Sequence, residues 1–473
     1  MRQAIRLVFP LMAGALVVAG SCTRRAPTAG DGSCDPLAAD CEDGLVCDPA
    51  LVGDPVCVLP VMIRGIVEQL SDQSPIEGAL VQAVDVNGAA VGTSGVTDSG
   101  GQYTLTVPAV RDEEGSPVDG VYTLRVQAAG YQEFPTAIRP ALPLDASAAE
   151  EGDEGWVIEN PLTTVGLLVL PGDLSQLGSI SGEILADAFA GILVVAEGGD
   201  GAYVGFSDSS GAYTIFNVPA GMYAVQGYAA GVQFDPVPVN VEPSEAVVDV
   251  DLVESTRPTS TVSGNVQIVN APGGSVTSVV LAVESTFVES VARGAVPPGL
   301  RIGGVTGAFA IAGVPDGRYV VLAAFENDDL VRDPDENIAG TQVLHIEVPD
   351  PVAGNAITIS DGFKITAALA VIFPGSDGPQ SVTDAAPVFE WQDDSSEDGY
   401  EIFVFDAFGN QIWADEIGSF SGGATVTHPY AGPPLEVGMF YQFRVFSFRE
   451  RGGSRSAISS TEDLKGVFFL APP

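Results

Sequence analysis

The 473-residue sequence has few basic residues and almost no histidine. It contains 19 Lys and Arg against 62 Asp and Glu, which gives a formal net charge of −43, and only two His. A surface that follows the phosphates of a nucleic acid needs clustered Lys and Arg, so we expect no nucleic-acid partner. Only His345 and His428 could supply an imidazole, so we do not expect catalysis that depends on histidine.

The motifs of common enzyme classes are also missing. The sequence has no Gly-x-Ser-x-Gly, no His-Glu-x-x-His, no Gly-x-x-x-x-Gly-Lys and no Gly-x-Gly-x-x-Gly. Among 62 acidic residues a carboxylate pair for glycoside hydrolysis always exists, yet nothing in the sequence marks out two of them. We therefore expect a non-catalytic protein without an organic cofactor, and an unrecognised hydrolase is the remaining alternative.

Apolar residues, Gly and Pro are abundant. Hydrophobic residues make up 46% of the chain and charged residues only 17%, which excludes a disordered acidic tail. The length allows about three to five domains. Beyond residue 21 no long segment has a helical period, and short apolar runs alternate with Gly and Pro turns. These features predict a secreted, β-rich, multi-domain protein.

The N-terminus has the pattern of an export signal. Arg2 and Arg6 precede an apolar run from Leu7 to Ala19, which is too short to span about 30 Å of hydrocarbon as a helix. The following Val18-Ala19-Gly20-Ser21-Cys22 resembles a bacterial lipobox. The resemblance implies that the signal peptide, residues 1–21, is removed and that Cys22 carries a lipid. It also implies an outer-membrane protein that faces the periplasm or the cell surface. Under the alternative, an ordinary secretory signal, Cys22 is incidental.

Four further cysteines stand close together, at Cys34, Cys41, Cys47 and Cys57. The segment 22–60 is too short to bury a core, and small exported modules replace a core with disulfides. Its spacing has no Cys-x-x-Cys pair and no nearby His, so it does not fit a zinc site. We expect two disulfides, with three possible connectivities, in a structural knob or stalk, and a recognition role is the alternative.

Three segments beyond residue 60 resemble one another. Each opens with an apolar strand that contains a Gly, and each then reaches a second Gly followed two residues later by an aromatic ring. The interval between copies is about 100 residues, close to the length of one β-sandwich domain. The opening glycines are Gly65, Gly182 and Gly264, and the later pairs are Gly101 with Tyr103, Gly211 with Tyr213 and Gly307 with Phe309.

The second segment carries the fullest motif, with Ser207-Asp-x-x-Gly-x-Tyr213 followed by Val218-Pro-x-Gly-x-Tyr223. This pattern resembles the carboxypeptidase regulatory-like domain. The first segment keeps the closing Ala-x-Gly-Tyr at 128–131 but has an acidic insertion at 111–120, and the third lacks the Asp. The resemblance implies prealbumin-like or starch-binding-like sandwiches over 61–145, 179–255 and 260–372, with an acidic linker and strand at 146–178. In that family the domain is a non-catalytic accessory that supports folding, attachment or sugar binding.

Residues 374–473 have a different pattern. The motif Pro387-x-Phe-x-Trp391 and the aromatic strands at 400–405 and 441–448 resemble a fibronectin type III or related immunoglobulin-like sandwich. The sequence as a whole therefore predicts an all-β chain. It consists of serial seven-stranded antiparallel β-sandwiches that follow a lipoprotein signal and a short disulfide-rich segment.

An acidic loop near residue 330 is a candidate calcium site, because calcium prefers six to eight oxygen ligands. An Asp-x-Asp-x-Asn run places three such ligands on alternate positions, although Ile338 stands where an EF-hand requires Gly. The alternative is a solvated acidic turn. The candidate ligands are Asp328, Asp329, Asp333, Asp335 and Asn337.

An aromatic stripe in the last domain is a candidate carbohydrate site. On its two main strands Phe403 and Phe405 share one face, as do Phe446 and Phe448. An exposed row of rings would let sugar rings stack on it, whereas a loop or neighbouring domain would cover it under the alternative. Four nearby arginines, at 444, 449, 451 and 455, either bind an anionic glycan or balance the local acidic residues.

We therefore expect a non-catalytic, lipid-anchored envelope protein, built as an extended scaffold that presents a binding surface. Carbohydrate is the first expected ligand. The alternative is a structural or adhesive module that contacts other envelope proteins and is stiffened by calcium.

Overall fold

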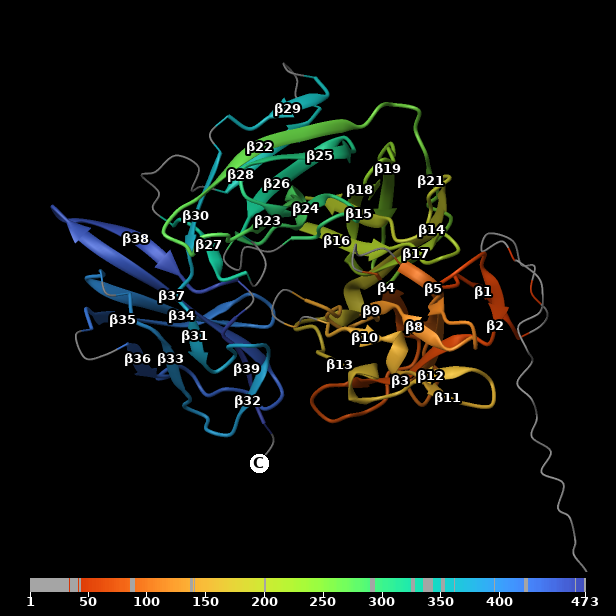
Figure 1. The fold of residues 1–473 in the computed structure, drawn as a ribbon, viewed down its shortest axis with the longest axis horizontal. Coiled ribbons are helices and arrows are strands. Elements are labelled where there is room, and N and C mark those ends of the chain that lie inside the picture. Colours follow the sequence, from red (N-terminus) through yellow and green to blue (C-terminus); the bar gives the residue numbers. More distant parts are fainter. Residues whose placement is uncertain are drawn as a thin grey trace, which may run out of the picture.

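The computed structural model describes residues 34, 41, 44–85, 90–136, 139, 141–199, 201–289, 294–324, 328–334, 343–349, 354–360, 362–394, 396–420, 424–463 and 465–471. These residues form strands arranged in serial two-sheet sandwiches (Figure 1), so the expected all-β fold class is confirmed. No helix in this part of the chain is long and apolar enough to span a membrane. The short 3-10 turns are η1 (Ala146–Ala148), η2 (Pro161–Thr163), η3 (Leu174–Gln176) and η4 (Glu284–Thr286).

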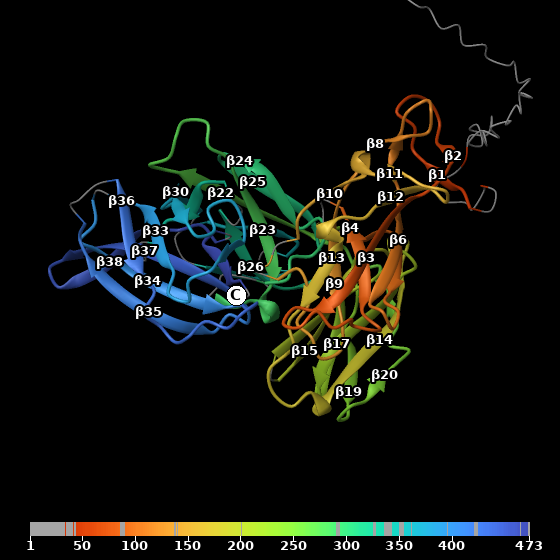
Figure 2. The same cartoon turned by 90° about the horizontal axis from the view of Figure 1, so that it is seen from below.

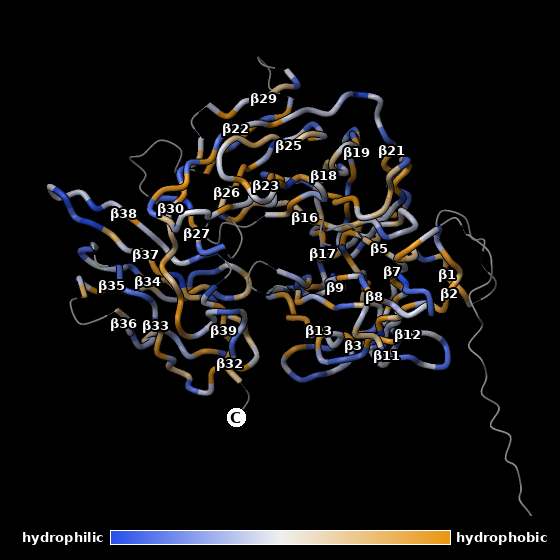
Figure 3. Tube along the Cα trace, viewed as in Figure 1, coloured by the Kyte–Doolittle hydropathy of each residue, from blue (hydrophilic) through white to orange (hydrophobic). Residues whose placement is uncertain are grey.

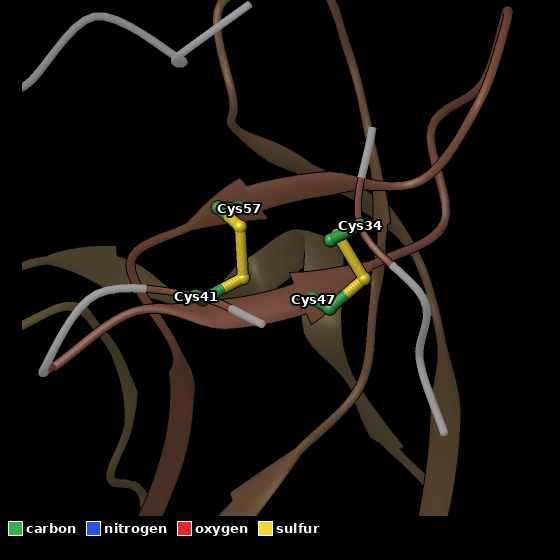
Figure 4. Close-up of a disulfide and its surroundings, with 4 residues drawn as sticks. All are labelled: Cys34, Cys41, Cys47 and Cys57. Carbon is green, nitrogen blue, oxygen red and sulfur yellow. A yellow bond between two sulfur atoms is a disulfide. The ribbon is translucent and has the colours of Figure 1, made fainter. Parts of the chain in front are cut away.

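A small disulfide-bonded hairpin, here called the knob, precedes the first sandwich and comprises Cys34, Cys41 and residues 44–60. Its strands β1 (Val46–Asp48) and β2 (Val56–Val58) pair antiparallel. Disulfides join Cys34 to Cys47 and Cys41 to Cys57 (Figure 4). The expected two disulfides are confirmed, and the structure has this one of the three connectivities.

The first sandwich encloses its core between two sheets. One has the order β10-β9-β4-β5, and the other is built on β3, which pairs with β6, β12 and β13. Along β6 the buried Tyr103, Leu105 and Val107 alternate with more exposed residues, as expected for a strand with one face on a core. The strands are β3 (Val61–Gln69), β4 (Leu80–Val84), β5 (Ala90–Val96), β6 (Gln102–Val107), the hairpin β7 (Val110–Arg111) and β8 (Pro117–Asp119), β9 (Val121–Gln127), β10 (Leu144–Asp145), β11 (Glu150–Glu151), β12 (Trp156–Ile158) and β13 (Thr164–Leu167).

Much of the interval 146–178, which the sequence assigns to an acidic linker and a strand, lies within this first sandwich. β12 and β13 run parallel to β3 at successive positions along it. Their residues Ile158, Val165 and Leu167 belong to the same buried apolar cluster as those of β3. The interval therefore completes the first sandwich as well as connecting it to the second.

The second and third sandwiches repeat the strand arrangement of the first. Their four-stranded sheets, β16-β15-β18-β19 and β24-β23-β26-β28, have the same order as β5-β4-β9-β10. The strands of the second are β14 (Leu177–Leu185), β15 (Leu193–Gly198), β16 (Gly201–Phe206), β17 (Ala212–Pro219), β18 (Gly221–Tyr228), β19 (Val237–Val241), β20 (Ala246–Val247) and β21 (Leu252–Val253). Those of the third are β22 (Ser260–Ile268), β23 (Thr277–Val283), β24 (Arg301–Val305), β25 (Ala308–Val314), β26 (Gly317–Ala323), β27 (Leu330–Arg332), β28 (Leu344–Val348), β29 (Ala356–Thr358) and β30 (Phe363–Ala367).

Each of these three sandwiches contains parallel pairing as well as the expected antiparallel pairing. The opening strand pairs antiparallel with one neighbour and parallel with the last strands of the same repeat. In the second sandwich β14 pairs antiparallel with β17 and parallel with β20 and β21. A parallel pair requires a crossover rather than a hairpin, and here the chain passes through the other sheet before it returns.

The glycine and the aromatic ring that mark each repeat are direct cross-strand partners, in the pairs Gly65–Tyr103, Gly182–Tyr213 and Gly264–Phe309. A Cβ on Gly182 would lie 2.0 Å from the carbonyl oxygen of Val250, so only Gly fits there. The Tyr213 hydroxyl donates a 2.5 Å hydrogen bond to that same oxygen. The ring thus covers the glycine and its hydroxyl satisfies the neighbouring backbone, which explains the spacing of the sequence motif.

The fourth sandwich has its own arrangement. A sheet of order β31-β33-β36 packs on a larger sheet of order β32-β39-β37-β34-β35, and β38 also pairs with β37. Tyr400, Ile402 and Val404 point into its core with Phe389 and Trp391, and all five are fully buried. The strands are β31 (Val371–Phe373), β32 (Gln380–Val382), β33 (Val388–Gln392), β34 (Gly399–Asp406), β35 (Gln411–Gly418), β36 (Thr425–Pro429), β37 (Phe440–Arg451), β38 (Ser454–Ser460) and β39 (Val467–Leu470).

The hydropathy of the chain follows this architecture. Hydrophobic segments recur along the strands of every sandwich, whereas the far end of the β37–β38 hairpin is hydrophilic (Figure 3). That end carries Arg449, Arg451 and Arg455, and it projects from the fourth sandwich (Figure 1). The hairpin therefore extends the sheet beyond the apolar core that the sandwich encloses.

The four sandwiches form a closed arrangement, so the expected extended scaffold is wrong. Consecutive sandwiches stack on one another, the second directly beneath the first in Figure 2, and the fourth lies beside the first (Figure 1). At the closing contact the Gln132 amide donates a 2.7 Å hydrogen bond to the carbonyl oxygen of Ala407. Contacts between domains so distant in sequence leave no local pattern, which is why the sequence did not predict them.

Candidate functional site

The lipidation expected at Cys22 lies outside the described residues, which begin at the knob. The knob is fixed to the first sandwich by a buried ion pair. Arg111 of β7 and Asp48 of β1 are 0% and 2% exposed, and their charged groups approach to 2.7 Å. Arg111 also donates to the carbonyl oxygens of Leu59 and Gly115, at 2.9 and 3.2 Å. Each charge thus has several partners that fix the knob to the first sandwich, although burial still raises the pKa of the Asp48 carboxyl against the opposing effect of Arg111.

Three of the five candidate calcium ligands are described, and two of them form ion pairs. The Asp333 carboxylate lies 2.8 Å from the Lys364 ammonium. The Asp329 carboxylate lies 3.4 Å from the Lys465 ammonium, which joins the third sandwich to the fourth. These two acids therefore already have cationic partners within the protein.

The remaining candidate calcium ligands are Asp328, Asp335 and Asn337. Asp328 accepts a 3.2 Å hydrogen bond from the Leu330 backbone, and burial raises the pKa of its carboxyl. Asp335 and Asn337 lie outside the described residues. Among the described residues, one group of three metal-ligating side chains lies close enough together to hold an ion, and it consists of knob cysteines whose sulfurs are held in disulfides. Calcium binding by this loop stays a prediction of the sequence.

The aromatic stripe of the fourth sandwich is partly covered. Phe405 and Phe448 are only 5% and 3% exposed. The Arg455 guanidinium lies 3.8 Å from the centre of the Phe448 ring. Phe403 and Phe446 are half-buried and meet edge to face, with ring centres 5.8 Å apart. A sugar ring could therefore reach only the Phe403–Phe446 pair, and carbohydrate binding there stays a prediction.

The arginines near the C-terminus are largely engaged with neighbouring acids. Arg455 forms ion pairs with three glutamates, at 2.8, 2.8 and 2.9 Å. Arg444 is buried and lies 2.6 Å from the carboxylate of Asp463. Arg449 donates from Nε to the Ser396 carbonyl oxygen at 2.6 Å. Of the two interpretations of this cluster, local charge balance agrees better with these contacts.

The two histidines lie on different sandwiches, and each contacts one carboxylate. His345 in β28 lies 2.6 Å from Glu284, and His428 in β36 lies 2.9 Å from Asp415. The ring of His428 also stacks on Trp413, with ring centres 5.9 Å apart. No sequence motif contains both histidines, and in the structure they lie in separate domains.

The turn that follows β9 in the first sandwich docks on the second sandwich through one side chain. Asn217, at the end of β17, accepts a 2.6 Å hydrogen bond from the Gly130 backbone. Its amide group donates to the carbonyl oxygens of Ala128 and Tyr131, at 3.1 and 3.0 Å. The Ala-x-Gly-Tyr turn, which the sequence identified as a family motif, is therefore part of the docking surface between repeats.

The second repeat docks on the third in the same way. The Gly231 backbone donates a 2.7 Å hydrogen bond to the carbonyl oxygen of Gly313. Gly313 corresponds to Asn217, since each precedes the Val-Pro of its repeat, and both have positive φ, 74° and 62°. The left-handed backbone at this position shapes the strand end that receives the turn. The sequence singled out neither residue as functional, although their shared place before Val-Pro was visible.

The other two junctions complete the closed arrangement. Between the third and fourth sandwiches the Ser459 hydroxyl donates a 2.9 Å hydrogen bond to the carbonyl oxygen of Ala367. Between the fourth and the first, buried Leu168 packs with Ala407 and Val467. The Arg139 guanidinium lies 4.8 Å from the centre of the Phe440 ring at the same contact. Apolar packing and specific hydrogen bonds thus hold the first and last sandwiches together.

A cavity of about 230 Å³ lies between the first and second sandwiches, beside the Asn217 junction. Aromatic rings of Tyr131, Tyr203 and Phe216 form part of its wall. Glu133 also lines it, and burial raises the pKa of this carboxyl, opposed by a hydrogen bond from Gln127 and by a nearby Arg. This cavity combines a carboxylate with aromatic walls, and no sequence motif marks it.

A larger groove, of about 490 Å³, lies between the third and fourth sandwiches. Its walls are mainly polar and include Gln392, Asp393, Asp394 and Arg449 from the fourth sandwich. The Asp394 carboxylate already has partners within the protein, because it accepts hydrogen bonds from the hydroxyls of Ser396 and Ser447. The groove is therefore a polar surface whose shape depends on the contact between two sandwiches.

Comparisons with known proteins leave the family of the chain open. No family model and no curated protein matches it. Among solved structures, the Bacillus anthracis TIE protein aligns at 12% identity over 84% of this chain and 68% of its own, with a TM-score of 0.15. The shaft pilin SpaA from Lactobacillus rhamnosus GG aligns at 12% identity over 41% of this chain and 96% of its own, with a TM-score of 0.17. A variant of BcpA, the major pilin subunit of Bacillus cereus, aligns at 11% identity over 64% of this chain and 99% of its own, with a TM-score of 0.17. At these TM-scores nothing about function is inferred from the three proteins.

Proposed function

We propose that this chain is a non-catalytic envelope protein, anchored by lipid at Cys22, whose four sandwiches form a preassembled scaffold for contact with other proteins. The observation that carries the proposal is the closed arrangement, in which each sandwich is held to its neighbours by hydrogen bonds and buried side chains. A scaffold of this kind keeps its surfaces in fixed relative positions, so a partner that spans two sandwiches loses little entropy on binding. The strong net negative charge keeps such an assembly soluble and favours cationic partners.

The domain types are part of the same proposal. We assign the first three sandwiches to the carboxypeptidase regulatory-like type and the fourth to the fibronectin type III-like type. The repeated strand order of the first three supports one ancestral domain, and their Gly–aromatic pairs match the motif that suggested the family. The fourth has a three-stranded sheet against a larger one, with Trp391 buried between them. That arrangement supports a fibronectin-like sandwich.

A retention experiment separates protein contact from carbohydrate binding. The purified chain is immobilised and exposed to envelope extract that has been treated with protease, with periodate to destroy glycans, or left untreated. Protein contact predicts that protease abolishes retention while periodate leaves it unchanged. Retention that survives protease and is lost with periodate would overturn the proposal in favour of carbohydrate.

The lipid anchor needs its own test in cells. Labelled palmitate should be incorporated by the natural chain and not by a Cys22→Ser variant, and only the natural chain should sediment with outer membranes. Labelling of the variant, or equal release of both chains into the soluble fraction, would contradict anchoring at Cys22.

Carbohydrate binding is kept as a second candidate because the polar groove of about 490 Å³ has carboxylate, amide and guanidinium groups in its walls. These groups suit the hydroxyls of a sugar, and the half-buried Phe403–Phe446 pair offers a stacking surface on the same sandwich. A glycan array with the natural chain and a Phe446→Ala variant tests it. Equal binding by the two chains would exclude the aromatic pair as the platform.

A further inference from the structure

The knob presents two aliphatic side chains to solvent, here called the tip. Leu51 and Val52, in the loop between β1 and β2, are 65% and 79% exposed. Val52 has the largest exposed fraction of any large hydrophobic residue in the described part of the chain. Neither residue belongs to the buried core of the first sandwich, on which the knob is mounted. The tip therefore offers apolar surface that the rest of the chain does not use.

The backbone beneath the tip is held by the first sandwich. The Leu51 N–H donates a 2.7 Å hydrogen bond to the carbonyl oxygen of Arg111, and the Arg111 N–H donates to the carbonyl oxygen of Pro49 at 2.9 Å. The same arginine forms the buried ion pair with Asp48. Because the backbone of the tip is already ordered, the protein loses little conformational entropy when a partner buries these side chains.

The chain enters the knob beside the tip. The Cys34 N–H donates a 3.1 Å hydrogen bond to the carbonyl oxygen of Pro55, three residues after Val52, and a disulfide joins Cys34 to Cys47 at the start of the same loop (Figure 4). Cys34 follows Cys22, to which we assign the lipid, by twelve residues in the sequence. A stretch of that length spans at most about 40 Å when fully extended. The lipid is therefore attached at the end of the knob that carries the tip.

We propose that Leu51 and Val52 insert into the surface of the bilayer that holds the lipid anchor, as a second contact with the membrane. The inference rests on the anchoring at Cys22 proposed above. Two aliphatic side chains alone would bind a free protein to a bilayer only weakly, although their removal from water is favourable. Once the anchor holds the chain at the bilayer, insertion is intramolecular, so even a weak contact is populated. A second contact also fixes the orientation of the sandwiches relative to the membrane.

The charge of the protein selects the kind of lipid surface. Asp54 is exposed and lies two residues after Val52, and the whole chain has a net charge of −43. Anionic headgroups repel a surface of this sign. We therefore expect the tip to insert among zwitterionic headgroups, such as phosphatidylcholine, rather than among anionic ones.

Hydrogen exchange on vesicles tests the proposal. The chain from Cys22 to Pro473 is coupled through the Cys22 thiol, the one cysteine outside the two disulfides, to a maleimide-bearing lipid in phosphatidylcholine vesicles. Backbone exchange over residues 52–54 should be at least threefold slower on the vesicles than for the same chain in solution. Vesicles of anionic phosphatidylglycerol should slow it less.

Two variants show whether the tip side chains are responsible. The double variant Leu51→Ser/Val52→Ser should exchange equally fast on vesicles and in solution. Val96→Ser is the matched control, because it removes a valine of the first sandwich that is 66% exposed and lies outside the knob. This control should keep the full slowing over residues 52–54.

Three outcomes would overturn the membrane contact. They are equal exchange of the natural chain on vesicles and in solution, slowing that persists in the double variant, and slowing that appears only when envelope protein is added. The last would assign the tip to a protein partner. Because the lipid is coupled chemically, this measurement does not depend on lipidation in cells. The palmitate-labelling test of Cys22 and the test of the tip can therefore fail separately.

Discussion

At the scale of single residues, steric and hydrogen-bonding requirements explain the glycine and the aromatic residue that mark each repeat. The opening glycine leaves no room for a side chain, because a Cβ on Gly65 or Gly182 would meet the backbone of a later segment and one on Gly264 would meet the Phe309 ring across from it. Phe309 replaces the tyrosine in the third repeat, so the hydroxyl is less essential than the ring. The glycine is the stricter requirement, because a Cβ on Gly182 would meet backbone rather than a flexible side chain.

A Gly182→Ala substitution should therefore destabilise the second sandwich strongly. The added Cβ would lie 2.0 Å from the Val250 carbonyl oxygen, and the strands must separate to admit it. We expect a loss of about 2–4 kcal/mol in the opening free energy of β14, measured by hydrogen exchange. Gly199→Ala is the control, since no atom lies within 4 Å of its added Cβ. Equal protection in both variants would refute the steric account.

Removing the Arg111 charge should release the knob. In Arg111→Met the buried Asp48 carboxylate loses its partner, and such a change costs about 3–5 kcal/mol. Hydrogen exchange over residues 44–60 should rise accordingly. The matched control is Arg64→Met, which breaks an exposed ion pair with Glu154 and should change protection by less than about 1 kcal/mol. A small, equal effect in both variants would mean that the buried pair does not hold the knob.

At the scale of elements, the turn between β9 and β10 and the end of β17 form a connector that recurs along the chain. The same positions dock the first repeat on the second and the second on the third, with an asparagine side chain in one case and a glycine backbone in the other. Both receiving residues have positive φ, which Asn and Gly tolerate better than other residues. The connector therefore depends on backbone shape first and on the side chain second.

Replacing Asn217 by Gly should separate these two contributions. Asn217→Gly keeps the left-handed backbone and loses three hydrogen bonds, whereas Asn217→Ala loses the bonds and adds strain. At about 0.5–1.5 kcal/mol for each hydrogen bond, Gly should weaken protection of residues 128–131 by about 1.5–4.5 kcal/mol. Ala should weaken it by about 1 kcal/mol more. Hydrogen exchange checks both values, and unchanged protection in Asn217→Gly would show that the side chain does not hold the turn.

At the scale of the whole molecule, closure depends on the contact between the first and fourth sandwiches. The contact brings together residues separated by 275 positions, and Leu168 lies at its apolar centre. Such a contact is intramolecular, so even a modest interface is populated once the other three junctions have formed. It is also the contact that a single charge could open while every sandwich stays folded.

A Leu168→Glu substitution should open the arrangement. Small-angle X-ray scattering of the natural chain should give a radius of gyration close to the value of about 23 Å that compact chains of this length have. The variant should be clearly larger, with the same circular dichroism spectrum. Leu185→Glu is the control, because Leu185 is 47% exposed on the second sandwich, and it should stay compact. A natural chain as large as the variant would contradict the closed arrangement.

The sequence alone determined the all-β class, the three repeats with their Gly–aromatic marks, the different last domain and the presence of two disulfides. These features are local, because strand alternation, turns and cysteine spacing depend on residues that are close together in the sequence. Only the tertiary structure decided the disulfide connectivity, the place of 146–178 in the first sandwich and the buried Arg111–Asp48 pair. It also decided the closed arrangement and the Glu133 cavity. Each of these depends on residues from distant segments meeting in space, and a protein that is acidic throughout gives no local sign of which few charges and amides will be buried at the junctions.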